Sequence, residues 1–130
     1  MQSLAALFRA LHLYAHEAHH SCKGPTFFAD HGFLEELYEA YLDAYDLVVE
    51  RLLGLGLPDF SEKEASRQAF ERYESMTSKE WFPALLSHER MLQKEIAAAN
   101  EGATLGTQNL LQGLADESEA RCYKIQQRIR

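Results

Sequence analysis

The stretch HHSCKGPTFFADH, residues 19–31, separates two long segments whose apolar residues follow helical spacing. Gly24 and Pro25 stand near its centre, and such a pair ends a helix because proline has no backbone N–H to donate. Asp30 is a residue type that caps the N-termini of helices. We therefore predict one helix over about residues 3–20 and a second helix that Asp30 caps.

Both segments carry apolar residues at steps of three and four, as one face of a helix requires. The first has Leu4, Phe8, Leu11, Ala15 and Ala18, and the second has Phe33, Leu34, Leu37, Tyr41, Tyr45, Val48, Val49 and Leu52. The second helix is expected to stop at the glycine- and proline-containing stretch 54–58.

Two more helices are predicted in the second half of the chain. The third begins within 77–81, where Thr77 and Glu80 fit a capping box. A start at Thr77 would place Pro83 deep in the helix, so this start stays open by one turn. The break at 102–106 ends that helix, and the last helix begins at about Thr107.

A polar connection, 59–78, joins the second and third helices and can hold a short helix built on Ala65, Ala69, Phe70 and Tyr73. Four long amphipathic helices with one long crossover are typical of a four-helix bundle with ferritin-type connectivity. We predict an all-α protein with a single domain over residues 1–130.

The composition of the chain excludes several classes of function. A formal net charge of −7 argues against nucleic acid and anionic membranes as partners and favours cations. No apolar run approaches the roughly 20 residues of a membrane span, and no signal peptide is evident. Cys22 and Cys122 are too few for a disulfide framework, which favours a reduced, cytoplasmic location.

Histidines and carboxylates on the second helix form two pairs with chelating spacing. His31 and Glu35 are four residues apart, as are Asp46 and Glu50. The rise from His31 to Asp46 is about 22 Å, so no single ion can touch both pairs of one helix. An antiparallel copy across a twofold axis would bring one pair of each chain together. The alternative is a solvated acidic face, which would carry the same carboxylates.

A longer motif resembles a known family. His19 and Gly24-Pro25 are followed by Phe27-Phe28, His31 and Glu35, and then by Asp46-x3-Glu50-Arg51. This pattern closely resembles the signature of the Dps family, the miniferritins. The likeness continues in 107–111 and 113–117, and so covers nearly the whole chain.

The resemblance implies a ferroxidase that oxidises Fe(II) with hydrogen peroxide or oxygen and stores the ferric mineral in a hollow homo-oligomeric shell of twelve subunits, protecting against oxidative stress. It implies that iron, as a mono- or dinuclear centre, binds at a subunit interface. His19, His31 and Glu35 would come from one subunit, and Asp46 and Glu50 from its twofold-related neighbour.

Three positions depart from the family pattern. Glu35 stands where the family usually has Asp, and His20 stands where it usually has Trp. Asn109 replaces the Asp that usually lines the acidic pore, which puts the usual route of iron into the shell in doubt. The lysine-rich N-terminal tail with which some members bind DNA is absent.

Two other functions remain as alternatives. One is a nucleoid-condensing protein that binds DNA, for which the chain offers only Arg128 and Arg130 as basic residues near its end. The other is a shell with degenerate iron sites, given Glu35 and Asn109. All five candidate ligands keep metal-competent chemistry, so the active ferroxidase is the favoured interpretation.

The remaining histidines are also candidates. His12, His16 and His19 share a face of the first helix, either as a second metal site or, more favoured, as surface or core residues. The role of His20 stays open. We interpret His88 as a hydrogen-bonded core residue and Tyr38 as a packing residue.

Overall fold

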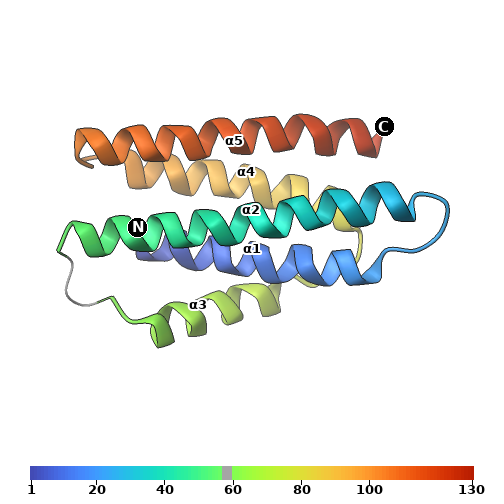
Figure 1. The fold of residues 1–130 in the computed structure, drawn as a ribbon, viewed down its shortest axis with the longest axis horizontal. Coiled ribbons are helices and arrows are strands. Elements are labelled where there is room, and N and C mark those ends of the chain that lie inside the picture. The colour runs from blue at the N-terminus through green and yellow to red at the C-terminus, as the bar shows by residue number, and fades with distance from the viewer. Residues whose placement is uncertain (57–59) are drawn as a thin grey trace. The chain divides into compact units, whose positions relative to one another are not determined.

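The computed structural model describes residues 1–56 and 60–130, and these residues form helices and no β-strand. The all-α prediction is therefore confirmed. The helices are α1 (Gln2–Ser21), α2 (Phe27–Gly54), α3 (Glu62–Ser75), α4 (Trp81–Asn100) and α5 (Leu105–Ile129) (Figure 1).

The chain forms two compact units, an N-terminal unit, Met1–Lys79, and a C-terminal unit, Glu80–Arg130. In the first, α1 packs along α2 on one side and α3 on another, and α1 and α2 run antiparallel (Figure 1). In the second, α4 packs against α5. A single domain over residues 1–130 stays a prediction.

The core of the N-terminal unit is built largely from the predicted apolar faces, to which Leu7 and Tyr14 are added. Its largest fully buried side chains are Leu7, Phe8, Leu11, Tyr14, Leu34, Tyr41 and Val48. Full burial of one such leucine or phenylalanine contributes about 1.5–3 kcal/mol before entropy is counted. The stripes thereby fix which face of α1 meets which face of α2, and the remaining faces are left to carry the polar side chains.

The start of α2 differs from the prediction. The helix begins at Phe27 with Thr26 as N-cap, so Asp30 is not the cap. Asp30 instead lies buried in the first turn, where its carboxylate accepts a hydrogen bond of 2.8 Å from the Thr26 hydroxyl. A carboxylate in the first turn is still favoured by the helix dipole. Gly24, with a φ of 85°, makes the preceding turn.

The start of α4 lies at the end of the predicted range 77–81, and α5 begins two residues before the predicted Thr107. The capping box of Thr77 and Glu80 is wrong, because α4 begins at Trp81 with Glu80 as its N-cap. Pro83 explains the shift, since only the first turn of a helix tolerates a residue without an N–H donor. α5 begins at Leu105, where the Thr104 side chain accepts a hydrogen bond from the Thr107 N–H. The predicted stop of α2 was the stretch 54–58. The helix ends at Gly54, and residues 57 and 58 lie outside the described residues.

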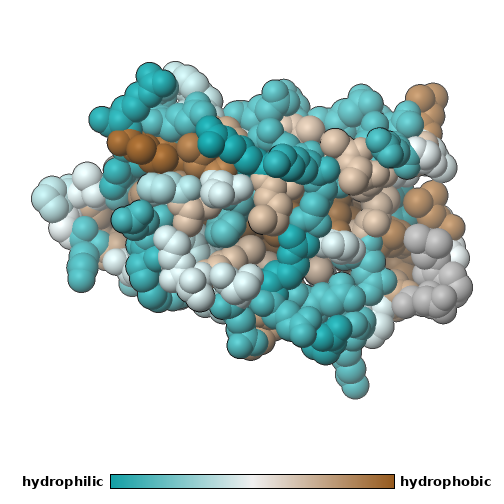
Figure 2. All heavy atoms as spheres, turned by 180° about the vertical axis from the view of Figure 1, so that it is seen from behind, coloured by the Kyte–Doolittle hydropathy of each residue, from teal (hydrophilic) through white to brown (hydrophobic). Residues whose placement is uncertain are grey.

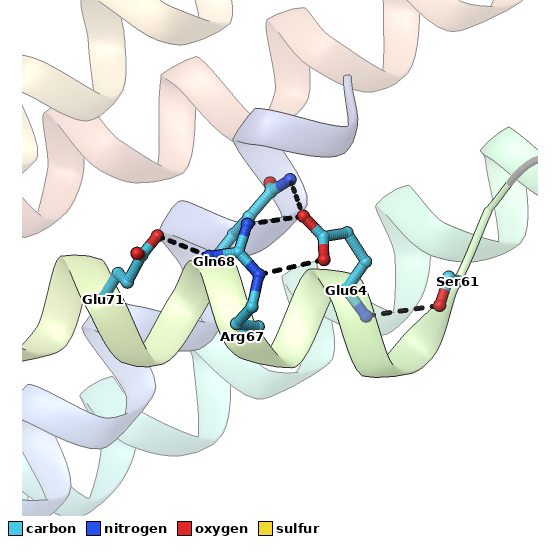
Figure 3. Close-up of polar contacts among 5 residues, drawn as sticks. All are labelled: Ser61, Glu64, Arg67, Gln68 and Glu71. Carbon is cyan, nitrogen blue, oxygen red and sulfur yellow. Dashed lines mark hydrogen bonds and ion pairs between the residues drawn. The ribbon is translucent and has the colours of Figure 1, made fainter.

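The crossover contains the expected short helix, α3, which has 14 residues. Ser61 caps it by accepting a hydrogen bond from the Glu64 N–H. Arg67 makes a bidentate contact with Glu64 and an ion pair of 3.0 Å with Glu71, and Gln68 also donates to Glu64 (Figure 3). These contacts lie on the exposed side of α3, and Ala65 and Ala69 face the core.

Glu17 links α1 to α3 and to the segment that follows α3. It accepts hydrogen bonds from the Lys79 ammonium at 2.9 Å and the Tyr73 hydroxyl at 2.7 Å. These two bonds, that of Lys79 first, hold the pKa of Glu17 below its usual value. Both oxygens of the Glu17 carboxylate are therefore engaged in anchoring α3. We do not count Glu17 as a metal ligand beside the histidines of α1.

The C-terminal unit contains a buried charge. Glu89 of α4 is 0% exposed and accepts hydrogen bonds from Ser118 at 2.5 Å and from Arg121 at 2.6 Å. Gln93 donates to the Ser118 hydroxyl at 3.1 Å and to the Cys122 sulfur at 3.4 Å. Burial, and then the nearby Glu89 carboxylate, raise the pKa of the Cys122 thiol. This cluster joins α4 to α5 through polar contacts.

Hydrophobic side chains also reach the surface. The face in Figure 2 mixes hydrophilic residues with separate hydrophobic ones. Phe28 and Leu105 are the most exposed large hydrophobic residues, at 88% and 84%. No described helix is long and apolar enough to cross a membrane.

Candidate metal centre

His19 and His31 meet where α1 gives way to α2. Their ring centroids are 3.6 Å apart and the rings are nearly parallel, at an angle of 20°. His19 is buried in the last turns of α1, and His31 is half-buried in the first turns of α2. The turn around Gly24 reverses the chain and brings the two imidazoles together.

Each imidazole is oriented by the backbone of the other histidine. The His19 Nδ1 lies 2.8 Å from the His31 carbonyl oxygen, and the His31 Nδ1 lies 3.1 Å from the His19 carbonyl oxygen. A carbonyl oxygen only accepts, so both Nδ1 atoms carry a proton in this network. The neutral rings then keep their lone pairs on Nε2, which is the arrangement of a metal-ligating histidine with an outer carbonyl partner.

Aromatic rings surround this pair. Phe27 stacks on His31 with centroids 4.7 Å apart, and Tyr38 meets His19 edge-on at 5.2 Å. The predicted packing role of Tyr38 agrees with this contact. Partial burial, then the carboxylates of Glu35 and Glu39, raise the pKa of the Tyr38 phenol. Sequence reasoning gave Phe27 no role, although its position four residues before His31 on one helix was a usable signal.

The carboxylates lie along α2 at two separate places. Glu35, Asp46 and Glu50 are all exposed. Because α2 is one continuous helix of 28 residues, the rise of about 22 Å from His31 to Asp46 holds in the structure. Asp46 and Glu50 therefore do not meet His19 and His31 within one chain. Among residues 1–56 and 60–130, no group of three or more His, Cys, Asp and Glu side chains is arranged to hold a metal ion.

Three more histidines extend the imidazole cluster along α1. The centroids of His16 and His20 are 4.4 Å apart, and those of His12 and His16 are 5.8 Å apart. His12 donates from Nδ1 to the Tyr38 carbonyl oxygen at 2.8 Å. Desolvation, then the neighbouring His20, His12 and His19, lower the pKa of His16. The predicted shared face of His12, His16 and His19 is confirmed, and His20 borders it.

The other residues singled out in the sequence lie apart from this cluster. His88 is half-buried on α4, and Asn109 is exposed on α5. Cys22 lies just after α1 and donates from its sulfur to the Ala18 carbonyl oxygen at 3.4 Å, a local contact that fits a structural role.

Comparisons with known proteins show the family to which the chain belongs. The ferritin-like domain family matches residues 2–130. The chain is 30% identical over 118 residues to a DNA protection during starvation protein of Helicobacter pylori, and the match spans 88% of this chain and 82% of the relative. A search of solved structures found no match. A family match over the whole length and a relative at this identity together show that the chain belongs to the Dps family of ferritin-like proteins.

Proposed function

We propose that this protein is a ferroxidase and iron store, which oxidises Fe(II) with hydrogen peroxide or oxygen at sites shared between two subunits. The ferric product would be retained in a closed homo-oligomeric shell. One observation carries the proposal. His19 and His31 are stacked, and each Nδ1 is held by a carbonyl, so both Nε2 lone pairs are available one turn from Glu35.

Each subunit would contribute two half-sites. The first is His19, His31 and Glu35, and the second is Asp46 and Glu50 on the same helix. A twofold axis that sets two α2 helices antiparallel pairs the first half-site of one subunit with the second half-site of the other. Two complete sites per dimer result, each with two imidazoles and three carboxylates.

This ligand set suits the chemistry of iron oxidation. Imidazole and carboxylate bind Fe(II), and the carboxylates, being hard anions, favour the more highly charged Fe(III) product. Two Fe(II) ions supply the two electrons that reduce one hydrogen peroxide, with two protons, to two water molecules. The net charge of −7 attracts the cation toward the protein.

Complementation between variants tests the shared site. We expect His31→Ala with Glu35→Ala to lose fast Fe(II) oxidation, followed as the absorbance rise of ferric product. Asp46→Ala with Glu50→Ala should lose it as well, because every site then lacks one half. Unfolding the two variants and refolding them together should restore activity to at most about half in each mixed dimer, since one of its two sites keeps all five ligands.

A matched control uses carboxylates of the same helix that have no place in the proposed site. Glu36→Ala with Asp43→Ala removes two carboxylates from exposed positions of α2, as Asp46→Ala with Glu50→Ala does, and should leave fast oxidation unchanged. If mixed assemblies form, as labelled subunits would report, and activity is still not restored, the site lies within one subunit. The shared-site proposal would then be wrong.

A protective role toward DNA is a second candidate, because the relative from Helicobacter pylori is named for it. Consuming Fe(II) and peroxide would protect DNA without contact, because the two together generate damaging radicals. This role therefore follows from the ferroxidase proposal and requires no DNA-binding surface.

A further inference from the structure

We propose that His16 and His20 form a second metal site on α1, which binds a divalent cation that prefers imidazole, such as Zn²⁺. This site is distinct from the half-site of His19, His31 and Glu35, called the iron half-site below. The two residues are four apart on one helix, the spacing at which histidine pairs chelate zinc. Neither residue belongs to the proposed iron site.

The rings of His16 and His20 lie slightly closer together than a shared ion requires. Their centroids are 4.4 Å apart and the rings are tilted by 41°. Because a zinc–nitrogen bond is about 2 Å, two imidazoles on one ion have centroids roughly 4.5–5.5 Å apart, depending on the angle at the metal. A small rotation about the side-chain bonds of His20, which is exposed, therefore suffices to aim both rings at one ion.

The pair differs from the iron half-site in its chemistry and is only partly set apart from it by distance. Between ring centroids, His16 is 6.2 Å and His20 is 5.4 Å from His19, whereas His19 and His31 are stacked at 3.6 Å. The iron half-site combines imidazole with carboxylate, which suits iron. An imidazole-only pair binds zinc, copper and nickel more tightly than Fe(II).

His12 is not a partner in this site. Its centroid is 5.8 Å from that of His16, and its Nδ1 is engaged by the Tyr38 carbonyl oxygen. His12 and His20 are separated by a rise of about 12 Å along α1 and cannot share an ion. Water would complete the coordination at the exposed end of the pair.

Titration of metal-free protein with Zn²⁺, followed by calorimetry, tests the assignment. We expect His16→Gln and His20→Gln each to weaken one zinc equivalent per chain at least tenfold. His12→Gln, on the same face one turn earlier, is the matched control and should keep that equivalent. The variant His31→Ala with Glu35→Ala should keep it too, although its iron oxidation is lost.

Circular dichroism and light scattering on each variant check helix content and assembly. His20 is exposed, so His20→Gln tests the site even if His16→Gln disturbs α1. Unchanged zinc binding in His20→Gln would overturn the proposal. Equal loss in His12→Gln, or loss of the same equivalent in His31→Ala with Glu35→Ala, would overturn it as well. Because the readout is zinc binding, failure of the iron proposal leaves this test intact.

Discussion

Glu89 is a fully buried charged residue of the C-terminal unit. Its carboxylate has no exposure to solvent and is satisfied by the hydroxyl of Ser118 and the guanidinium of Arg121, which is itself largely buried. Removing one partner of a buried ion pair leaves the other charge uncompensated, and that is costly.

We therefore predict that Glu89→Ala lowers the free energy of unfolding by about 3–5 kcal/mol, measured by urea denaturation. Glu64→Ala, which removes the carboxylate that Arg67 holds on the exposed side of α3, is the control and should have a far smaller effect. Similar losses in the two variants would mean that the Glu89 charge is not held as the structure indicates.

For single residues, the sequence predicts candidate metal ligands but not the contacts around them. Spacing on one helix follows directly from residue numbers, and it makes His31, Glu35, Asp46 and Glu50 candidates. The carbonyl contacts of His19 and His31 were not predicted, because they depend on how the turn at Gly24 folds back. Long-range contacts of this kind have no periodic signature.

Among the elements, the interiors of the helices were predicted well and their starts less well. Apolar spacing predicted the interiors of α1, α2 and α3 correctly, because the burial of apolar side chains dominates the stability of those segments. At the starts, local preferences compete. Asp30 is a good cap by residue type, yet Thr26 takes that position, and Pro83 moves the start of α4 forward to Trp81.

The turn between α1 and α2 yields a prediction at this scale. Gly24 has a φ of 85°, and nothing lies within 4 Å of a Cβ built there. Gly24→Ala should therefore cost about 1–2 kcal/mol through backbone strain alone. Gly113→Ala, in the middle of α5 with equal space around it, should instead stabilise the protein by up to about 1 kcal/mol.

Thermal and urea unfolding of both glycine variants provide the comparison. Opposite signs for the two substitutions would attribute the effect to the left-handed backbone at Gly24. A neutral Gly24→Ala would contradict the conformation of this turn.

At the scale of the whole molecule, two features of the surface indicate that copies of the chain assemble. Phe28 and Leu105 expose most of their surface, and the carboxylates of Asp46 and Glu50 lie far from the histidines of the same chain. Both features are explained if subunits cover one another. We predict a closed oligomer of twelve chains of 14.9 kDa each, measured by light scattering at neutral pH and moderate salt. A stable monomer under these conditions would refute it.

The charge of the whole molecule also bears on whether it binds DNA. A chain with 13 Lys and Arg against 20 Asp and Glu should repel phosphate, and the repulsion multiplies on assembly. We predict no mobility shift of plasmid DNA at physiological salt. A shift that weakens as salt is raised would reveal a basic surface that the net charge conceals.

The crossed contacts between His19 and His31 have one more consequence, which concerns when these two candidate ligands become ordered. Each ring is anchored to the backbone of the other residue before an ion arrives. The rotamer entropy of the two side chains, about 1 kcal/mol each, is therefore lost once, when the chain folds. If ions are loaded and released many times, this half of the site returns to the same shape after every cycle, and uptake requires no refolding of the turn.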